Sequence, residues 1–217
     1  MSGRLRLAGA LGVALLMLSI GVVVGVVWQT SRADDPHRPS VTDIGFAQDM
    51  SAHHDQAILM ANSLSRTVAP EITGLADRIV VAQTAETATM RGWLTWFGSP
   101  VTSDHPMSWM STAGGHDHPG GSPQRSTPDT APMPGMASID ELGRLSVAQG
   151  RAAEILFLQL MIRHHQGGLE MATAAYNDPR TSTTTKQFAM TMIGDQGDEI
   201  GQMTLLLHAR NSRPLPA

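Results

Sequence analysis

The chain of 217 residues contains no cysteine. This absence excludes disulfides, thiolate zinc sites and cysteine nucleophiles. It also removes the side chain that redox-active metals oxidise most readily. Aromatic residues are few, with four Trp, four Phe and one Tyr, whereas methionine occurs 14 times. Methionine can fill a core as an adaptable hydrophobe, but several methionines here fall in polar stretches, where that explanation fails.

Strong positive charge is also lacking. The chain carries 15 Lys and Arg against 19 Asp and Glu, a formal net charge of −4. Without a basic cluster, the phosphate attraction that dominates nucleic-acid binding is missing, so we expect no nucleic-acid partner. The sequence also has no phosphate-binding loop, nucleotide fingerprint or Ser/His/Asp spacing, which argues against a hydrolase or transferase.

One long apolar run is present near the N-terminus. Residues 7–28 carry no charge and are numerous enough to span a bilayer as a helix. Arg4 and Arg6 precede the run, so we expect residues 1–6 to form a cytoplasmic tail and the rest to lie outside the cytoplasm. The run exceeds the apolar part of a secretory signal, which favours an uncleaved single-pass anchor. Small residues at Ser31 and Ala33 leave a cleaved, secreted form open.

Helical signals divide the rest of the chain. We expect a linker at 29–39, a first helical hairpin at 40–98, a Met/His/Gly/Pro-rich loop at 99–137, a second hairpin at 138–210 and a tail at 211–217. Within the first hairpin, Ser40 and Asp43 predict a helix that extends to about Arg66, and Pro70 suits the first turn of the next. Within the second, Ser138 and Glu141 predict a helix to about Tyr176, and Asp178-Pro179 predicts the start of the last helix.

The two hairpins share a duplicated pattern. Residues 50–61 read MSAHHDQAILMA and residues 161–172 read MIRHHQGGLEMA. Each copy is followed by Gln-x2-Glu-x3-Met, at 83–90 and again at 196–203. No sustained alternating pattern indicates strands. We therefore predict an all-α fold, an antiparallel four-helix bundle built from two repeated helical hairpins.

The repeated residues are candidate metal ligands. Met and His three or four positions apart share one face of a helix, as do the Glu and Met of the second pattern. The candidates in the bundle are Met50, His53, His54, Glu86, Met90, Met161, His164, His165, Glu199 and Met203. The two glutamates could bind the metal or accept hydrogen bonds that orient the histidines. Which histidine of each pair faces inward is open. The alternative is a metal-free polar core in which His, Gln and Glu fix the helix register.

Ligand chemistry favours copper among the metals. Thioethers suit Cu(I), and imidazoles suit Cu(II) and other late transition metals. A di-iron bundle would need Glu-x-x-His on two helices, but Met stands three residues before each His pair. Silver and zinc are lesser candidates.

The 99–137 loop adds ligands of the same kind. They comprise His116 and His118 together with two Met-x-x-Met pairs, Met107/Met110 and Met133/Met136. The loop could instead be a solvated spacer.

These motifs resemble the domain of unknown function 305 family. The resemblance covers about residues 40–209 and rests on the M-x-x-H-H-x-x-A-x-x-M-A helix, the Q-x-x-E-x-x-x-M helix and the M-x-G-M segment. It implies a ferritin-like four-helix fold in an exported or membrane-anchored protein, and some members are linked to periplasmic copper binding and copper tolerance. Gly168 departs from the family's Ala, which Ala57 retains, and should loosen packing without removing a ligand.

Together these observations predict a membrane-anchored, extracytoplasmic protein that binds copper for sequestration or delivery. Metal ions, and the membrane through the N-terminal helix, are the predicted partners. Two alternatives stay open. One is a metal-dependent oxidase, which would consume oxygen with turnover. The other is a structural or interaction bundle without metal, which copper would not stabilise.

Overall fold

The structure is a computed structural model that describes residues 17–25, 38–111 and 133–215. The chain divides into two units, Met1–Arg38 and Pro39–Ala217. In the first unit, residues 17–25 are helical. Across the described residues, no helix is both long and apolar enough to cross a membrane. Most of the predicted span at 7–28 lies outside the described residues.

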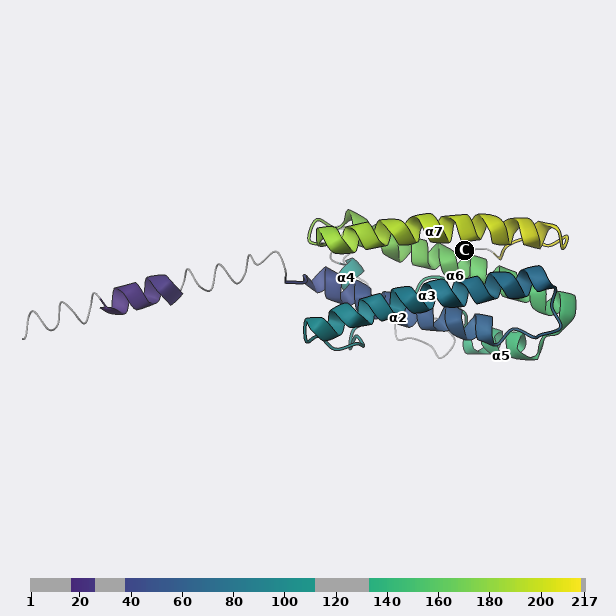
Figure 1. Cartoon of the computed structure of the whole chain (residues 1–217), viewed down its shortest axis with the longest axis horizontal. Helices are drawn as coiled ribbons and strands as arrows, with labels where there is room; N and C mark the ends of the chain where they lie inside the picture. Colours follow the sequence, from purple (N-terminus) through teal and green to yellow (C-terminus); the bar gives the residue numbers. More distant parts are fainter. Residues whose placement is uncertain (1–16, 26–37, 112–132, 216–217) are drawn as a thin grey trace, which may run out of the picture. The chain divides into compact units, whose positions relative to one another are not determined.

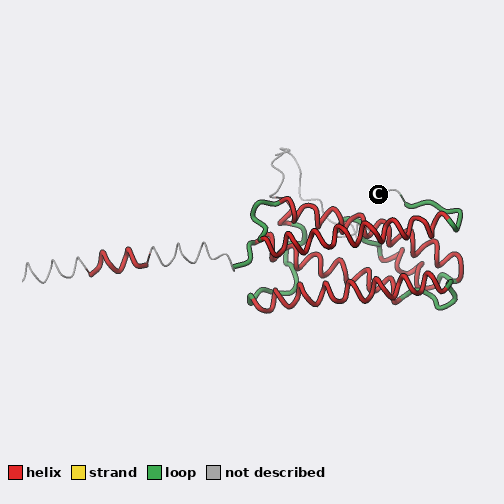
Figure 2. Tube along the Cα trace, turned by 45° about the horizontal axis from the view of Figure 1, so that its top comes forward, coloured by secondary structure: helices red, strands yellow, loops and turns green. Residues whose placement is uncertain are grey.

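The second unit is a bundle of four long helices that run side by side (Figure 1). They are α2 (Val41–Asn62), α3 (Pro70–Trp96), α6 (Gly150–Asn177) and α7 (Thr183–His208), with the short helices α4 (Ser108–Ser111) and α5 (Ile139–Val147) beside them. In the parts of the chain that the structure describes, every regular element is a helix (Figure 2). The prediction of an all-helical fold is confirmed.

The helix starts follow the capping signals of the sequence. Ser40 accepts a hydrogen bond from the Asp43 N–H, and the Asp43 carboxylate accepts one from the Ser40 N–H. Ser138 and Glu141 form the same reciprocal pair at the start of α5. Pro70 occupies the first turn of α3, where its missing N–H costs nothing.

Three helix boundaries differ from the prediction. α2 ends at Asn62 and not near Arg66. The helix predicted from Ser138 to Tyr176 is broken into α5 and α6, because Gln149 is extended and Gly150 has a φ of 52°. α7 begins at Thr183, after the cap Ser182.

α7 starts later than predicted because Asp178, the residue predicted to cap it, has other partners. The Asp178 carboxylate instead accepts hydrogen bonds from the Arg180 side chain and from the Thr42 hydroxyl of α2. The stretch predicted as a loop also contains the short helix α4.

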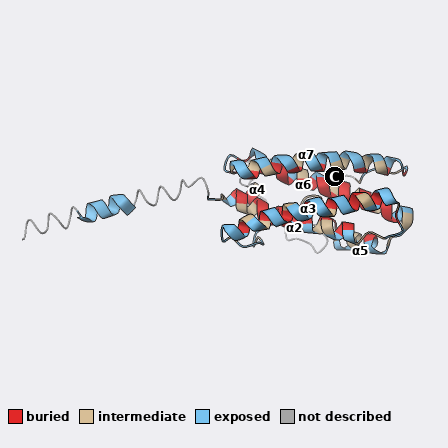
Figure 3. Ribbon diagram, in the orientation of Figure 1, coloured by how far each residue is buried: buried red, intermediate tan, exposed pale blue. Residues whose placement is uncertain are grey.

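The core lies between the four long helices, whose inward faces are buried and outward faces exposed (Figure 3). It consists of two groups of buried side chains. We call the one that contains Met50, Met90, Met171 and Met192 the Met50 cluster. The other contains Met60, Ile79, Met161 and Met203 and is the Met161 cluster. Each named residue of one cluster is the duplicate of a named residue of the other, so the bundle is pseudo-symmetric.

Candidate metal site

The four duplicated histidines form a continuous row across the bundle. α2 supplies His53 and His54, and α6 supplies His164 and His165. The ring centroids of His53 and His164 are 3.8 Å apart. The centroids of the neighbouring rings are 6.5 Å apart in α2 and 6.3 Å apart in α6. All four residues are at most 1% exposed, so both histidines of each pair face inward.

A glutamate closes each end of the row. His54 Nε2 lies 2.7 Å from Glu86 Oε2 of α3, and His165 Nε2 lies 2.6 Å from Glu199 Oε2 of α7. The two glutamate side chains are 15% and 21% exposed. With its Nε2 on a carboxylate, each imidazole leaves Nδ1 free, the arrangement typical of metal-binding histidines. Neither Nδ1 has a hydrogen-bond partner in the described structure.

The two central histidines differ in their partners. His53 Nε2 donates to the Pro134 carbonyl oxygen at 3.0 Å. In the described structure, the buried Nδ1 and Nε2 of His164 make no hydrogen bond. Buried polar atoms are normally paired, because an unpaired one loses its hydration without compensation. The centre of the row therefore holds ring nitrogens that a bound ion or water would satisfy.

Burial keeps the central imidazoles neutral. It lowers the pKa of His53 to about 3, with a further contribution from repulsion by His54. It also lowers the pKa of His164 well below 6.5, with repulsion from His53 adding to the effect. Neutral imidazole is the form that binds metals, so the fold presents these two rings ready for coordination at neutral pH.

The candidate methionines of the bundle are all fully buried but divide between the two clusters. Met50 and Met90 belong to the Met50 cluster, and Met161 and Met203 belong to the Met161 cluster. Within the described residues, no three His, Asp or Glu side chains converge as a metal-binding group. An ion held by this row would therefore need ligands besides His, Asp and Glu to complete its coordination.

The segment 133–137 lies against α6 beside the row. A Cβ added to Gly167 would fall 2.0 Å from the Pro134 carbonyl oxygen, and one added to Gly135 would fall 2.3 Å from the Arg163 carbonyl oxygen. Two glycines thus allow backbone to pack on backbone, and Gly135 also needs its positive φ of 73°. This approach is what brings the Pro134 carbonyl to His53.

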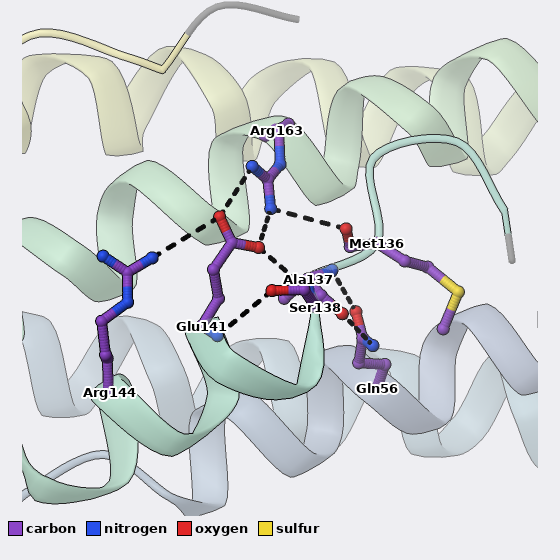
Figure 4. Close-up of polar contacts among 7 residues, drawn as sticks. All are labelled: Gln56, Met136, Ala137, Ser138, Glu141, Arg144 and Arg163. Carbon is purple, nitrogen blue, oxygen red and sulfur yellow. Dashed lines mark hydrogen bonds and ion pairs between the residues drawn. The ribbon is translucent and has the colours of Figure 1, made fainter. Parts of the chain in front are cut away.

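Side chains of α2, α5 and α6 hold the 133–137 segment in place (Figure 4). The Gln56 amide donates to the Ala137 carbonyl at 3.0 Å and accepts from the Ala137 N–H at 2.7 Å. The Arg163 guanidinium contacts the Met136 carbonyl and forms an ion pair with Glu141. The same guanidinium lowers the pKa of the Glu141 carboxyl.

Gly168 has a different role from the one expected. A Cβ at this position would fall 2.4 Å from Gln196 Oε1, so the glycine leaves room for the buried Gln196 amide. The packing is therefore not loosened there. Neither Oε1 nor Nε2 of Gln196 has a hydrogen-bond partner among the described residues. The buried glutamine is one more polar group beside the row.

Several residues of the site went unpredicted. Gln56 follows the histidine pair in the sequence, but its bond to Ala137 depends on the return of the chain from the loop. Pro134 and Gly167 act through their backbones, which carry no side-chain signal. The M-x-G-M pattern could have indicated Gly135 as a close backbone approach. The candidates His116 and His118 lie outside the described residues.

The family model described as "Domain of unknown function (DUF305)" matches residues 43–207. This match covers most of the chain, which therefore belongs to that family. Among curated proteins, none matches the chain.

Solved structures share the fold. A DUF305 protein from Streptomyces coelicolor is 32% identical with a TM-score of 0.69, and the match covers 81% of this chain and 98% of that one. A DUF305 fragment from Deinococcus radiodurans is 27% identical with a TM-score of 0.64, covering 79% and 99%. CopM in its Cu(I)-bound form is 26% identical with a TM-score of 0.56, covering 78% and 98%.

Proposed function

We propose that this protein binds copper outside the cytoplasm, at the histidine row and the adjoining methionines, for sequestration or delivery. The observation that carries the proposal is the row itself, in which buried imidazoles stand in contact while ring nitrogens of His54, His164 and His165 have no hydrogen-bond partner in the described structure. A copper ion would bind the unprotonated nitrogen of one or two of these imidazoles.

A metal-free polar core accounts less well for the same atoms. Such a core is stabilising when every member is hydrogen-bonded, and a partly satisfied network costs more than an apolar core of the same shape. Both ring nitrogens of His164 are unpaired in the described structure. The free energy lost there favours a missing ligand over a structural network.

Copper is the ion that best fits the donor set. Neutral imidazoles bind late transition metals, and thioethers favour soft ions such as Cu(I). The chain has no cysteine to compete for the ion. CopM, at 25–26% identity, has been solved in Cu(I)-bound and Cu(II)-bound forms, which supports the same choice. The apolar run at 7–28 supports a location beyond the membrane.

Paired substitutions in the full-length protein test the proposal. The variants are His53→Gln/His164→Gln and His54→Gln/His165→Gln. The matched control is His105→Gln/His208→Gln, which alters two exposed histidines. Each protein is titrated with Cu(I) under reducing conditions against a chromophoric chelator. Circular dichroism establishes that the variants remain folded.

We expect each paired variant of the row to lose copper affinity by more than about 10-fold, because direct ligands matter at least as much as the groups that orient them. The control should bind as the wild type does. Folded row variants with wild-type affinity and stoichiometry would refute the proposal.

A further inference from the structure

The two core clusters are nearly symmetric inside but differ in the residues that cover them. Seven partly buried hydrophobic residues pack against the Met50 cluster, and three of them are methionines, Met107, Met110 and Met136. Ten such residues pack against the Met161 cluster, and none is a methionine. All three methionines come from the chain between the two hairpins, so this end of the core carries thioethers that the duplicated helices do not supply.

These methionines come from the two Met-x-x-Met pairs that flank residues 112–132. Met107 and Met110 belong to the segment around α4, and Met133 and Met136 belong to the 133–137 segment. Met133 is part of the Met50 cluster itself, and the other three pack against it. The fold thus brings to one end of the core four thioethers that are far apart in the sequence, three of them partly open to solvent.

The first pair is held by a buried carboxylate. Asp49 of α2 is 1% exposed, and its Oδ2 accepts hydrogen bonds from the Met107 N–H at 2.7 Å and from Trp109 Nε1 at 2.8 Å. Met107 has a φ of 65°, which is costly for a residue that carries a Cβ atom and persists only where the surroundings impose it. Burial raises the pKa of the Asp49 carboxyl, and its hydrogen bonds with Met107 and Trp109 oppose the rise.

The second pair is held just as firmly, by contacts that do not involve the first. The Gln56 side chain hydrogen-bonds to both the N–H and the carbonyl oxygen of Ala137. Gly167 has no Cβ, so the Pro134 backbone can pack directly against α6. Both pairs therefore have fixed backbones, while the methionine side chains themselves contribute no hydrogen bond to this anchoring.

We propose that Met107, Met110, Met133 and Met136 form a second metal site, made of thioethers alone, that binds soft monovalent ions such as Ag(I) and Cu(I). Thioether sulfur prefers ions of this class, whereas hard divalent ions such as Mg(II) and Mn(II) prefer oxygen ligands. This site shares the soft-metal chemistry of the proposed function but none of the ligands in the histidine row. Because the thioether site is partly exposed, an ion from solvent can reach it without passing the buried histidines.

Silver binding by the full-length protein tests the site. The test variant replaces Met107, Met110, Met133 and Met136 with Leu, which nearly preserves volume. The control replaces Met60 and Met190 with Leu, two methionines outside both candidate sites and outside the Met50 cluster. The stoichiometry of Ag(I) is measured by elemental analysis after dialysis against a weak competing ligand, alongside the His53→Gln/His164→Gln variant.

We expect the test variant to lose one bound Ag(I) per chain and the control to lose none. The His53→Gln/His164→Gln variant should keep this Ag(I). A result that refutes the thioether site therefore differs from one that refutes copper binding at the histidine row. Equal silver binding by the test variant and the wild type would overturn the proposal, as would an equal loss in the control.

A second measurement on the wild-type protein does not depend on the variants folding. Peroxide converts accessible methionines to sulfoxides, and a bound ion shields the sulfur it occupies. Mass spectrometry should show that Ag(I) slows oxidation of Met107, Met110 and Met136 but not of the exposed Met190. Equal slowing at Met190, or none at the three, would also overturn the site.

Discussion

Gly167→Ala tests whether the 133–137 segment depends on a glycine in α6. The added Cβ would lie 2.0 Å from the Pro134 carbonyl oxygen, 2.4 Å from its carbonyl carbon and 2.8 Å from the Gly135 nitrogen. Real Cβ atoms do not approach other atoms closer than 3.0 Å, so the segment must move by roughly 1 Å or more. Every atom in the way belongs to the backbone, and no side chain can rotate aside.

The magnitude follows from three contributions. Overpacking of this kind costs about 1–3 kcal/mol. Displacing Pro134 also breaks its hydrogen bond with His53, which costs about 1 kcal/mol. Replacing glycine with alanine inside a helix returns about 1 kcal/mol. The free energy of unfolding should therefore fall by about 1–3 kcal/mol.

Gly92→Ala is the matched control, because an added Cβ at this helical position meets no atom within 4 Å. This variant should be more stable than the wild type by up to about 1 kcal/mol. Urea unfolding of the full-length proteins, followed by far-UV circular dichroism, measures both changes. If Gly167→Ala proved as stable as Gly92→Ala, the backbone contact between the segment and α6 would be refuted.

Two further predictions concern the histidine row. Unfolded histidines take up protons below pH 6.5, whereas folded His53 resists protonation until about pH 3; stability present above pH 6.5 is therefore lost as the pH falls towards 3. The thermal midpoint of the metal-free protein should therefore decline between pH 6.5 and pH 3. The midpoint of His53→Gln/His164→Gln should decline by less over the same range. Equal declines in the two proteins would contradict the burial of neutral imidazoles. Second, Glu86→Gln and Glu199→Gln should each weaken copper binding by about 10- to 100-fold, because each removes the carboxylate that orients a histidine. The chelator titration measures the copper affinity of each variant, and Glu170→Gln, on the exposed side of α6, is the control. Wild-type affinity in both Glu86→Gln and Glu199→Gln would show that neither glutamate acts at the metal.

The sequence predicts the four long helices well because their signals are local. Ser40 and Ser138 each stand three residues before an acid, and the caps form as expected. The duplicated motifs also predict that at least one histidine of each pair faces the interior, since repetition marks the face shared by both halves. The sequence does not reveal that both histidines of a pair are buried, because this requires α2 to contact two other helices at once.

Other features depend on contacts between distant segments. Gln149 and Gly150 interrupt a helix that the pattern of Ser138 to Tyr176 predicts as continuous. Asp178 is engaged by Thr42 of another helix and leaves the capping of α7 to Ser182. The meeting of the two Met-x-x-Met pairs on one cluster follows from Asp49 and Gln56, whose partners lie on opposite sides of residues 112–132. Local patterns carry no information about such pairings.

The anchoring of both flanks to α2 has a consequence for the insert that they enclose. Asp49 and Gln56 are two turns apart on one helix, which corresponds to about 10 Å along its axis. A chain whose two ends are pinned so near each other pays a closure entropy that grows only slowly, by about 0.6 kcal/mol for each doubling of its length. The stability of the bundle should therefore depend only weakly on the number of residues between the two flanks.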